Sequence, residues 1–101
     1  MKTPPLPVHE IDMMHAVFRR YPKVTSATIF GSRAKGTHTV RSDVDLALNG
    51  DIAPLETQAI AADLDELPLP YHFDVQSLQN IAHPPLREHI ERVGICIYST
   101  T

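Results

Sequence analysis

Two short motifs in the first half of the chain hold residues whose types and spacing suit phosphate and metal chemistry. One is the turn Gly31-Ser32-Arg33, and the other is the pair Asp43 and Asp45, which a single residue separates. Gly31 has no Cβ to obstruct a phosphate, and the free N–H groups of a short helix opening after it would point at the anion. Carboxylates supply the hard oxygen ligands that Mg²⁺ prefers. The two motifs together predict a site for a magnesium-bound nucleotide.

The glycine turn fits neither of two well-known phosphate-binding patterns. The Walker pattern G-x-x-x-x-G-K-[ST] would need lysine where the chain has Thr37, and the dinucleotide pattern G-x-G-x-x-G would need glycine in place of Arg33. Ser32 adds a hydroxyl donor, and Arg33 or Lys35 can offset phosphate charge. The sequence therefore predicts a phosphate-binding turn of another class.

A third carboxylate joins the pair if two expected strands are neighbours. Apolar residues alternate with Asp45 in residues 44–48 and with Asp74 in residues 71–76, and alternate residues of a strand face opposite sides of a sheet. The apolar sets would then form a core, while Asp43, Asp45 and Asp74 would gather on the opposite face. Such a group could bind one Mg²⁺ ion, or two ions about 3.5–4 Å apart. These three residues are the predicted metal ligands and catalytic carboxylates.

The order of helices and strands predicts an α+β fold that can position this site. Apolar residues recur at three and four residues in the first expected helix, and β-branched residues dominate the first expected strand. The helices are expected at 9–21, 54–67 and 84–93, and the strands at 24–30, 44–48, 71–76 and 95–98. We expect one mixed β-sheet, with the helices packed on one face and the carboxylates on the other.

The proline-rich segment Thr3-Pro4-Pro5-Leu6-Pro7 cannot continue a helix or a strand, and it predicts an extended tail over residues 1–8. Residues 9–101 are expected to form one domain, because a chain of 101 residues can bury one modest core. No apolar stretch reaches the length of a membrane span, and no signal peptide is recognisable. These features predict a cytoplasmic protein with no membrane association.

The charge of the chain restricts its class of partner. The formal net charge is −3 at pH 7, whereas a protein that binds nucleic acid by neutralising phosphates needs a basic face. Direct nucleic-acid binding is therefore not expected. The single cysteine, Cys96, lies in an apolar run, and we expect it to be a buried free thiol.

Simpler structural roles compete with the chemical ones. An isolated Asp-x-Asp can cap a chain or turn it into a strand, so the prediction of a metal site depends on the glycine turn and on Asp74. The six histidines are too scattered to predict a zinc site. The sequence leaves open the roles of Lys35, Arg41 and His72, and it predicts packing roles for Tyr71 and Tyr98.

The two motifs also resemble those of a known family. Gly31-Ser32-Arg33, followed by Ser42-Asp43-Val44-Asp45-Leu46 and a later lone Asp74, resembles the minimal nucleotidyltransferase (MNT) group of the DNA polymerase β-like superfamily. The resemblance covers nearly the whole chain and implies the polymerase β-like fold. It also implies nucleotide binding by the glycine turn, with Gly31 and Ser32 at the β- and γ-phosphates of ATP. Asp43 and Asp45 would bind Mg²⁺, and Asp74 would complete the metal site and help deprotonate the attacking hydroxyl.

The resemblance further implies a partner and a reaction. Members of this group pair with HEPN-domain proteins, often as the antitoxin of a HEPN toxin, and they can move AMP from ATP to a tyrosine of that toxin. We therefore expect an adenylyltransferase that forms a hetero-oligomer with a HEPN partner. The alternatives are a binding module that masks a HEPN partner without catalysis, and nucleotidyl transfer to a small molecule or an RNA end. Transfer to a small molecule or an RNA end is the less favoured alternative, because the chain offers no second domain to bind such an acceptor and carries a net negative charge.

Overall fold

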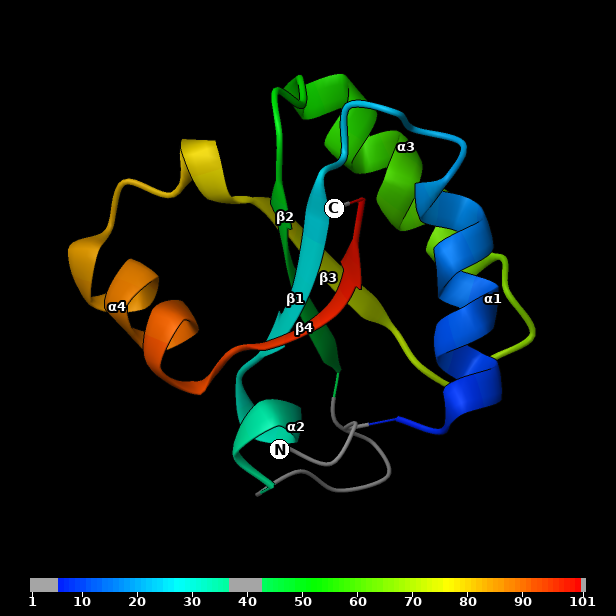
Figure 1. Ribbon diagram of the computed structural model, residues 1–101, viewed down its shortest axis with the longest axis horizontal. Coiled ribbons are helices and arrows are strands. Elements are labelled where there is room, and N and C mark those ends of the chain that lie inside the picture. The colour runs from blue at the N-terminus through cyan, green and yellow to red at the C-terminus, as the bar shows by residue number, and fades with distance from the viewer. Residues whose placement is uncertain (1–5, 37–42, 101) are drawn as a thin grey trace.

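The computed structural model describes residues 6–36 and 43–100 and contains one four-stranded mixed sheet with the strand order β3-β2-β1-β4 (Figure 1). β1 pairs antiparallel with both β2 and β4, whereas β2 pairs in parallel with β3. The elements in chain order are α1 (Val8–Phe18), β1 (Ser26–Phe30), α2 (Ser32–Lys35), β2 (Val44–Asn49), α3 (Pro54–Asp65), β3 (Phe73–Ser77), the 3₁₀ helix η1 (Leu78–Asn80), α4 (Pro84–Val93) and β4 (Ile95–Ser99). This arrangement confirms the predicted α+β class and the mixed sheet.

The main hydrophobic core lies between one face of the sheet and the helices α1 and α3. The alternation predicted for β2 holds, because Val44, Leu46 and Leu48 all point into this core and are fully buried. Phe18 of α1 and Leu64 of α3 are also fully buried there. Burial of this apolar surface is the main driving force that holds the two helices on the sheet.

The opposite face of the sheet carries α4, so the expectation that the helices pack on one face is wrong for this helix. In Figure 1, α4 lies across the sheet from α1 and α3. A second apolar cluster joins Phe30 and Ala47 of the sheet to Ile81 and to Ile90 of α4. These sheet residues form an apolar patch beside the carboxylates, and the apolar side of α4 removes that patch from water.

Several boundaries differ from the sequence-based expectations for local reasons. α1 ends at Phe18 instead of residue 21, because Pro22 disfavours helical geometry in the residue before it and the chain leaves the helix in tight turns. Of the tail predicted over residues 1–8, residues 1–5 lie outside the described residues, Leu6 is buried in the core, and Val8 already belongs to α1. In the described part of the chain, no helix is both long and apolar enough to cross a membrane.

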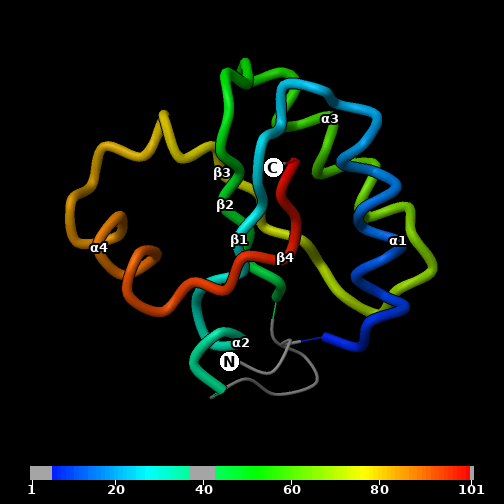
Figure 2. The backbone as a smooth tube through the Cα atoms, viewed as in Figure 1, coloured from blue at the N-terminus to red at the C-terminus, as the bar shows by residue number. Residues whose placement is uncertain are grey.

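Cys96 is exposed, so the expectation of a buried thiol is wrong. Cys96 pairs with Thr28 across the β4–β1 ladder, where the register shifts between Ala27 and Thr28. Figure 2 traces the chain from α4 directly into β4, which forms one edge of the sheet. The thiol stays in contact with solvent because it faces a hollow beside this edge and is not covered by the core.

Two leucines of α3 allow a matched test of this packing. Leu64 is fully buried, whereas Leu55 is 78% exposed. Leu64→Ala should therefore lower the free energy of unfolding by about 2–5 kcal/mol, because it leaves a cavity in the core. Leu55→Ala, the control in the same helix, should change it by less than about 0.5 kcal/mol. Denaturant unfolding followed by circular dichroism gives both values, and equal losses would contradict the assigned orientation of α3.

Candidate active site

Parallel pairing of β2 with β3 places two of the predicted carboxylates side by side. The register aligns Asp45 with Asp74, and on the other side of β2 it aligns Asp45 with Phe30, the last residue of β1. Asp43 lies two residues before Asp45, is exposed, and precedes the first residue of β2. The pairing therefore sets Asp45 and Asp74 side by side, as the alternation predicts, and Asp43 lies just before the same end of β2.

The electrostatics of Asp45 reflect this crowding. Burial raises the pKa of the Asp45 carboxyl above its ordinary value, and the negative charges of Asp74 and Asp43 raise that pKa further. Like charges disfavour one another's ionised forms, so a cation at this place would relieve the repulsion. His89 acts in the opposite direction and lowers the pKa of Asp45.

The donor set at this site suits a magnesium ion that is bound together with its substrate. In residues 6–36 and 43–100, no three His, Cys, Asp or Glu side chains converge into a group that could hold a metal ion by themselves. Mg²⁺ does not require such a group, because it commonly binds one or two carboxylates and takes its other ligands from water and substrate phosphates. Asp43 and Asp45 fit that pattern, and their mutual repulsion with Asp74 favours a cation between them.

The glycine turn lies directly against the carboxylates. Gly31 follows β1 with φ 74° and ψ −151°, a conformation that is essentially restricted to glycine. A Cβ added to Gly31 would overlap the Oδ2 atom of Asp45. Ser32 then opens the single turn of α2, in which the Lys35 N–H donates to the Gly31 carbonyl at 3.1 Å. Glycine is therefore needed here because the Asp45 carboxylate occupies the space that a Cβ would fill. This requirement is separate from the room for phosphate that the sequence suggests.

Arg33 occupies a different environment from its neighbours in the turn. Its side chain is buried, with the residue only 6% exposed, and its Cζ atom lies 4.6 Å from the centre of the Tyr71 ring. Tyr71 in turn donates a hydrogen bond from its hydroxyl to Glu10 Oε1 at 2.7 Å. The guanidinium that the sequence predicts at the nucleotide is thus packed on an aromatic ring. Lys35, by contrast, is exposed.

The sequence left open the roles of two further residues, His72 and Arg41. His72 is exposed, and its Nδ1 atom lies 3.7 Å from Asp65 Oδ1 at the end of α3. Asp65 Oδ1 also accepts a hydrogen bond from the Phe73 N–H, so the partner that the structure gives His72 belongs to α3. Arg41 lies outside the described residues.

His89 is a residue near the site that the sequence analysis missed. It belongs to α4, and its ring lies edge-on to Phe30, with ring centres 6.3 Å apart and an interplanar angle of 81°. Phe30 pairs with Asp45 and precedes Gly31, so α4 brings an imidazole close to the point where the two motifs meet. In the sequence, His89 directly precedes Ile90, which faces the second apolar cluster. This position indicates a place near the carboxylates only once α4 is known to cover the carboxylate face of the sheet.

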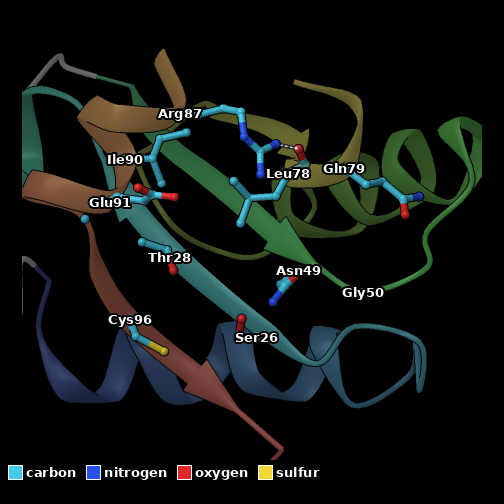
Figure 3. A pocket seen from close by; sticks show the side chains of 11 residues that line it. Ser26, Thr28, Asn49, Gly50, Leu78, Gln79, Arg87, Ile90, Glu91 and Cys96 are labelled. Atoms are coloured by element: carbon cyan, nitrogen blue, oxygen red, sulfur yellow. Dashed lines mark hydrogen bonds between the residues drawn. The ribbon is translucent and has the colours of Figure 1, made fainter. Parts of the chain in front are cut away.

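A separate hollow occupies the other end of the same sheet face (Figure 3). This cavity has a volume of about 620 Å³ and lies between the sheet, η1 and α4. Its polar lining includes Ser26, Thr28, Asn49, Arg87, Glu91 and Cys96. Arg87 donates from Nη1 to the Leu78 carbonyl at 2.6 Å, a bond that joins α4 to η1. The predicted site residues do not line this cavity, and the apolar cluster of Phe30, Ala47, Ile81 and Ile90 occupies the sheet face between them.

Replacing Asp45 with asparagine should stabilise the metal-free protein near neutral pH. The pKa of Asp45 is raised on folding, so folding disfavours its charged form, and this loss of stability appears as the pH rises through the folded-state pKa. In EDTA, Asp45→Asn should melt a few degrees above wild type at about pH 7, and the difference should vanish below about pH 4.

Asp51→Asn, at an exposed position after β2, is the control for this measurement and should melt with the wild type at both pH values. A lower melting temperature for Asp45→Asn at neutral pH would show that the carboxylate serves as a cap or turn residue.

Gly31→Ala should destabilise the protein more than Gly36→Ala. Both glycines have positive φ, 74° and 78°, but nothing lies within 4 Å of a Cβ at Gly36, whereas a Cβ at Gly31 meets Asp45. The left-handed conformation costs an alanine at Gly36 roughly 1–2 kcal/mol, whereas an alanine at Gly31 meets both a conformation essentially restricted to glycine and the overlap with Asp45. Thermal melts compare the two variants. In a double variant, Asp45→Ala should restore part of the melting temperature that Gly31→Ala loses, because it removes the overlapping carboxylate. Equal melting temperatures for the two glycine variants would contradict the contact.

Comparison with solved structures finds the same fold in toxin–antitoxin complexes. A toxin–antitoxin crystal structure with AMP-PNP matches at 22% identity with a TM-score of 0.75, over 90% of this chain and 74% of that chain. The structure of MntA-HepT matches at 18% identity and a TM-score of 0.70, over 93% and 74% of the respective chains. A complex of tri-AMPylated Shewanella oneidensis HEPN toxin with MNT antitoxin matches at 19% identity and a TM-score of 0.69, over 91% and 71%.

Sequence comparison gives the family. No curated protein sequence matches the chain significantly. The profile of the family described as polymerase beta, nucleotidyltransferase matches residues 13–101, which include the glycine turn, the carboxylate pair and Asp74. The fold, the meeting of the two motifs and this match agree, and the chain belongs to the polymerase β nucleotidyltransferase family.

Proposed function

We propose that this protein is a Mg²⁺-dependent adenylyltransferase that moves AMP from ATP to a tyrosine hydroxyl of a HEPN-domain partner. The observation that carries the proposal is the contact of Gly31 with Asp45, which sets the turn that we assign to phosphate binding against a carboxylate paired with Asp74. Membership of a nucleotidyltransferase family supports nucleotidyl transfer in general. The AMP-PNP complex and the AMPylated HEPN toxin among the similar structures support the choice of nucleotide and acceptor.

The residues take the following roles in the proposed reaction. Gly31 and Ser32 would hold the β- and γ-phosphates of ATP. Asp43 and Asp45 would provide the carboxylate ligands for Mg²⁺, and Asp74 would complete the metal site once substrate is bound. Bound Mg²⁺ would neutralise the charge that develops on the phosphates during transfer. Asp74, beside Asp45 and exposed to solvent, is placed to accept a proton from an incoming hydroxyl.

The transfer itself is an in-line displacement at the α-phosphorus. The acceptor oxygen forms a bond to the α-phosphorus, the bond from that phosphorus to the bridging oxygen breaks, and pyrophosphate leaves with the bonding electron pair. The hydroxyl proton passes to the Asp74 carboxylate. Catalysis of this kind depends mainly on positioning and on charge stabilisation.

A HEPN partner explains how a domain with so open a site obtains its acceptor. Asp43 and Asp74 are both exposed, so the acceptor side of the site is not enclosed by this chain's described residues. Binding of a partner beside this face would bring its tyrosine to the carboxylates and exclude water at the same time. We therefore propose a hetero-oligomer with the HEPN protein.

A second candidate function is a binding module that masks the HEPN partner without catalysis. One observation favours it, namely that no preformed three-ligand metal group exists among residues 6–36 and 43–100. The two candidates differ in whether the partner is modified covalently, and that difference can be measured directly.

The reaction should be visible as a mass increase of one or more AMP groups on the partner. Purified protein is incubated with ATP, Mg²⁺ and a candidate HEPN-domain partner, and the partner is analysed by intact-mass spectrometry. Asp45→Asn and EDTA should each abolish the mass shift, because both remove the bound metal, while Asp51→Asn should retain it. Neutralisation of the partner by Asp45→Asn, without ATP and without any mass shift, would favour the binding module.

A further inference from the structure

The contact between Arg33 and Tyr71 joins two parts of the site that the sheet alone does not connect. Arg33 belongs to α2, two residues after Gly31, whereas Tyr71 precedes β3 and lies three residues before Asp74. The guanidinium carbon lies 4.6 Å from the centre of the Tyr71 ring, within the range of an attractive cation–π contact. The contact therefore ties the glycine turn to the strand that carries the third carboxylate.

Tyr71 is itself held on three sides. Its hydroxyl donates to Glu10 Oε1 of α1 at 2.7 Å, and its ring meets Phe73 nearly at right angles, with ring centres 6.3 Å apart. Burial, the hydrogen bond to Glu10 and the charge of Glu10 raise the pKa of Tyr71, against a smaller lowering by Arg33. The ring is thus a fixed, neutral platform between α1 and β3.

The burial of Arg33 also bears on its role. Arginine is rarely buried to this degree, 6% exposed, unless it is paired. A guanidinium that leaves the Tyr71 ring to reach a phosphate would give up this contact and expose the ring face. The exposed Lys35, two residues further along α2, can supply a mobile positive charge without such a loss.

We propose that Arg33 is a positioning residue, which fixes the Gly31-Ser32 turn against β3 by packing on Tyr71, and that Glu10 orients the Tyr71 ring for this purpose. This assignment replaces the role at the phosphates that the sequence suggests for the Arg33 side chain. The expected effect of Arg33 on AMP transfer rests on the proposed function. Its effect on the order of the Gly31-Ser32 turn does not, because that effect can be measured without ATP or a partner.

A double-mutant cycle tests the assignment. Arg33→Met and Tyr71→Leu should each slow AMP transfer by about threefold to tenfold at saturating ATP. The double variant should be no slower than the worse single variant, because both changes remove the same contact. Tyr71→Phe, which keeps the ring, should transfer faster than Tyr71→Leu. Tyr21→Leu is the matched control, since Tyr21 is also half-buried and donates a hydrogen bond to a carboxylate, that of Asp63, but lies away from the site. The transfer rate of this variant should equal that of the wild type.

Amide hydrogen exchange supplies the readout that does not depend on activity. The Lys35 N–H donates to the Gly31 carbonyl and the Gly36 N–H to the Arg33 carbonyl, so their protection reports the order of the turn. Arg33→Met and Tyr71→Leu should both lower this protection, and Tyr21→Leu should not. If the wild type transfers no AMP, the proposed function fails while these exchange rates still test the positioning role.

The phosphate-ligand alternative makes the opposite prediction. Calorimetry with the ATP analogue AMP-PNP and Mg²⁺ would then show weaker binding for Arg33→Met and unchanged binding for Tyr71→Leu. Additive losses in the double variant, or unchanged protection of Lys35 and Gly36 in Tyr71→Leu, would likewise overturn the inference.

Discussion

The parallel pairing of β2 with β3 is the constraint on which the rest of the site depends. It sets Asp45 of the interior strand β2 beside Asp74 of the edge strand β3, where burial and like charge both disfavour ionisation of Asp45. The adjoining turn must then begin with glycine, because a Cβ at Gly31 would occupy the space of the Asp45 carboxylate. Two motifs that lie apart in the sequence are therefore sterically and electrostatically dependent on each other.

Such crowding opposes stability in the metal-free protein and is compensated elsewhere. The core between the sheet and the helices α1 and α3 is fully buried at Phe18, Leu46 and Leu64. It lies on the face opposite the carboxylates, so this packing can be dense without restricting access to the site. Separation of a stabilising face from a functional face is a common way to tolerate unfavourable electrostatics at a site.

The sequence allowed the sheet and the carboxylates to be predicted because strand alternation is a local signal. In β2, Val44, Leu46 and Leu48 alternate with Asp45, and this pattern requires no knowledge of the neighbouring strands. The position of α4 could not be predicted in the same way, because both faces of the sheet carry apolar residues that a helix could cover. The approach of His89 to the site and the burial of Arg33 against Tyr71 depend on such long-range placement, and propensity carries no information about it.

The exposed thiol of Cys96 is a ready attachment point for a spectroscopic label. The chain contains one cysteine, and Cys96 lies on the edge strand β4, with β1 between it and the carboxylate-bearing strand β2. A single fluorophore or spin label can therefore be attached there without a background of other thiols. Because α4 leads directly into β4, a label at this position would report movements of the helix that carries His89 while leaving the carboxylates unmodified.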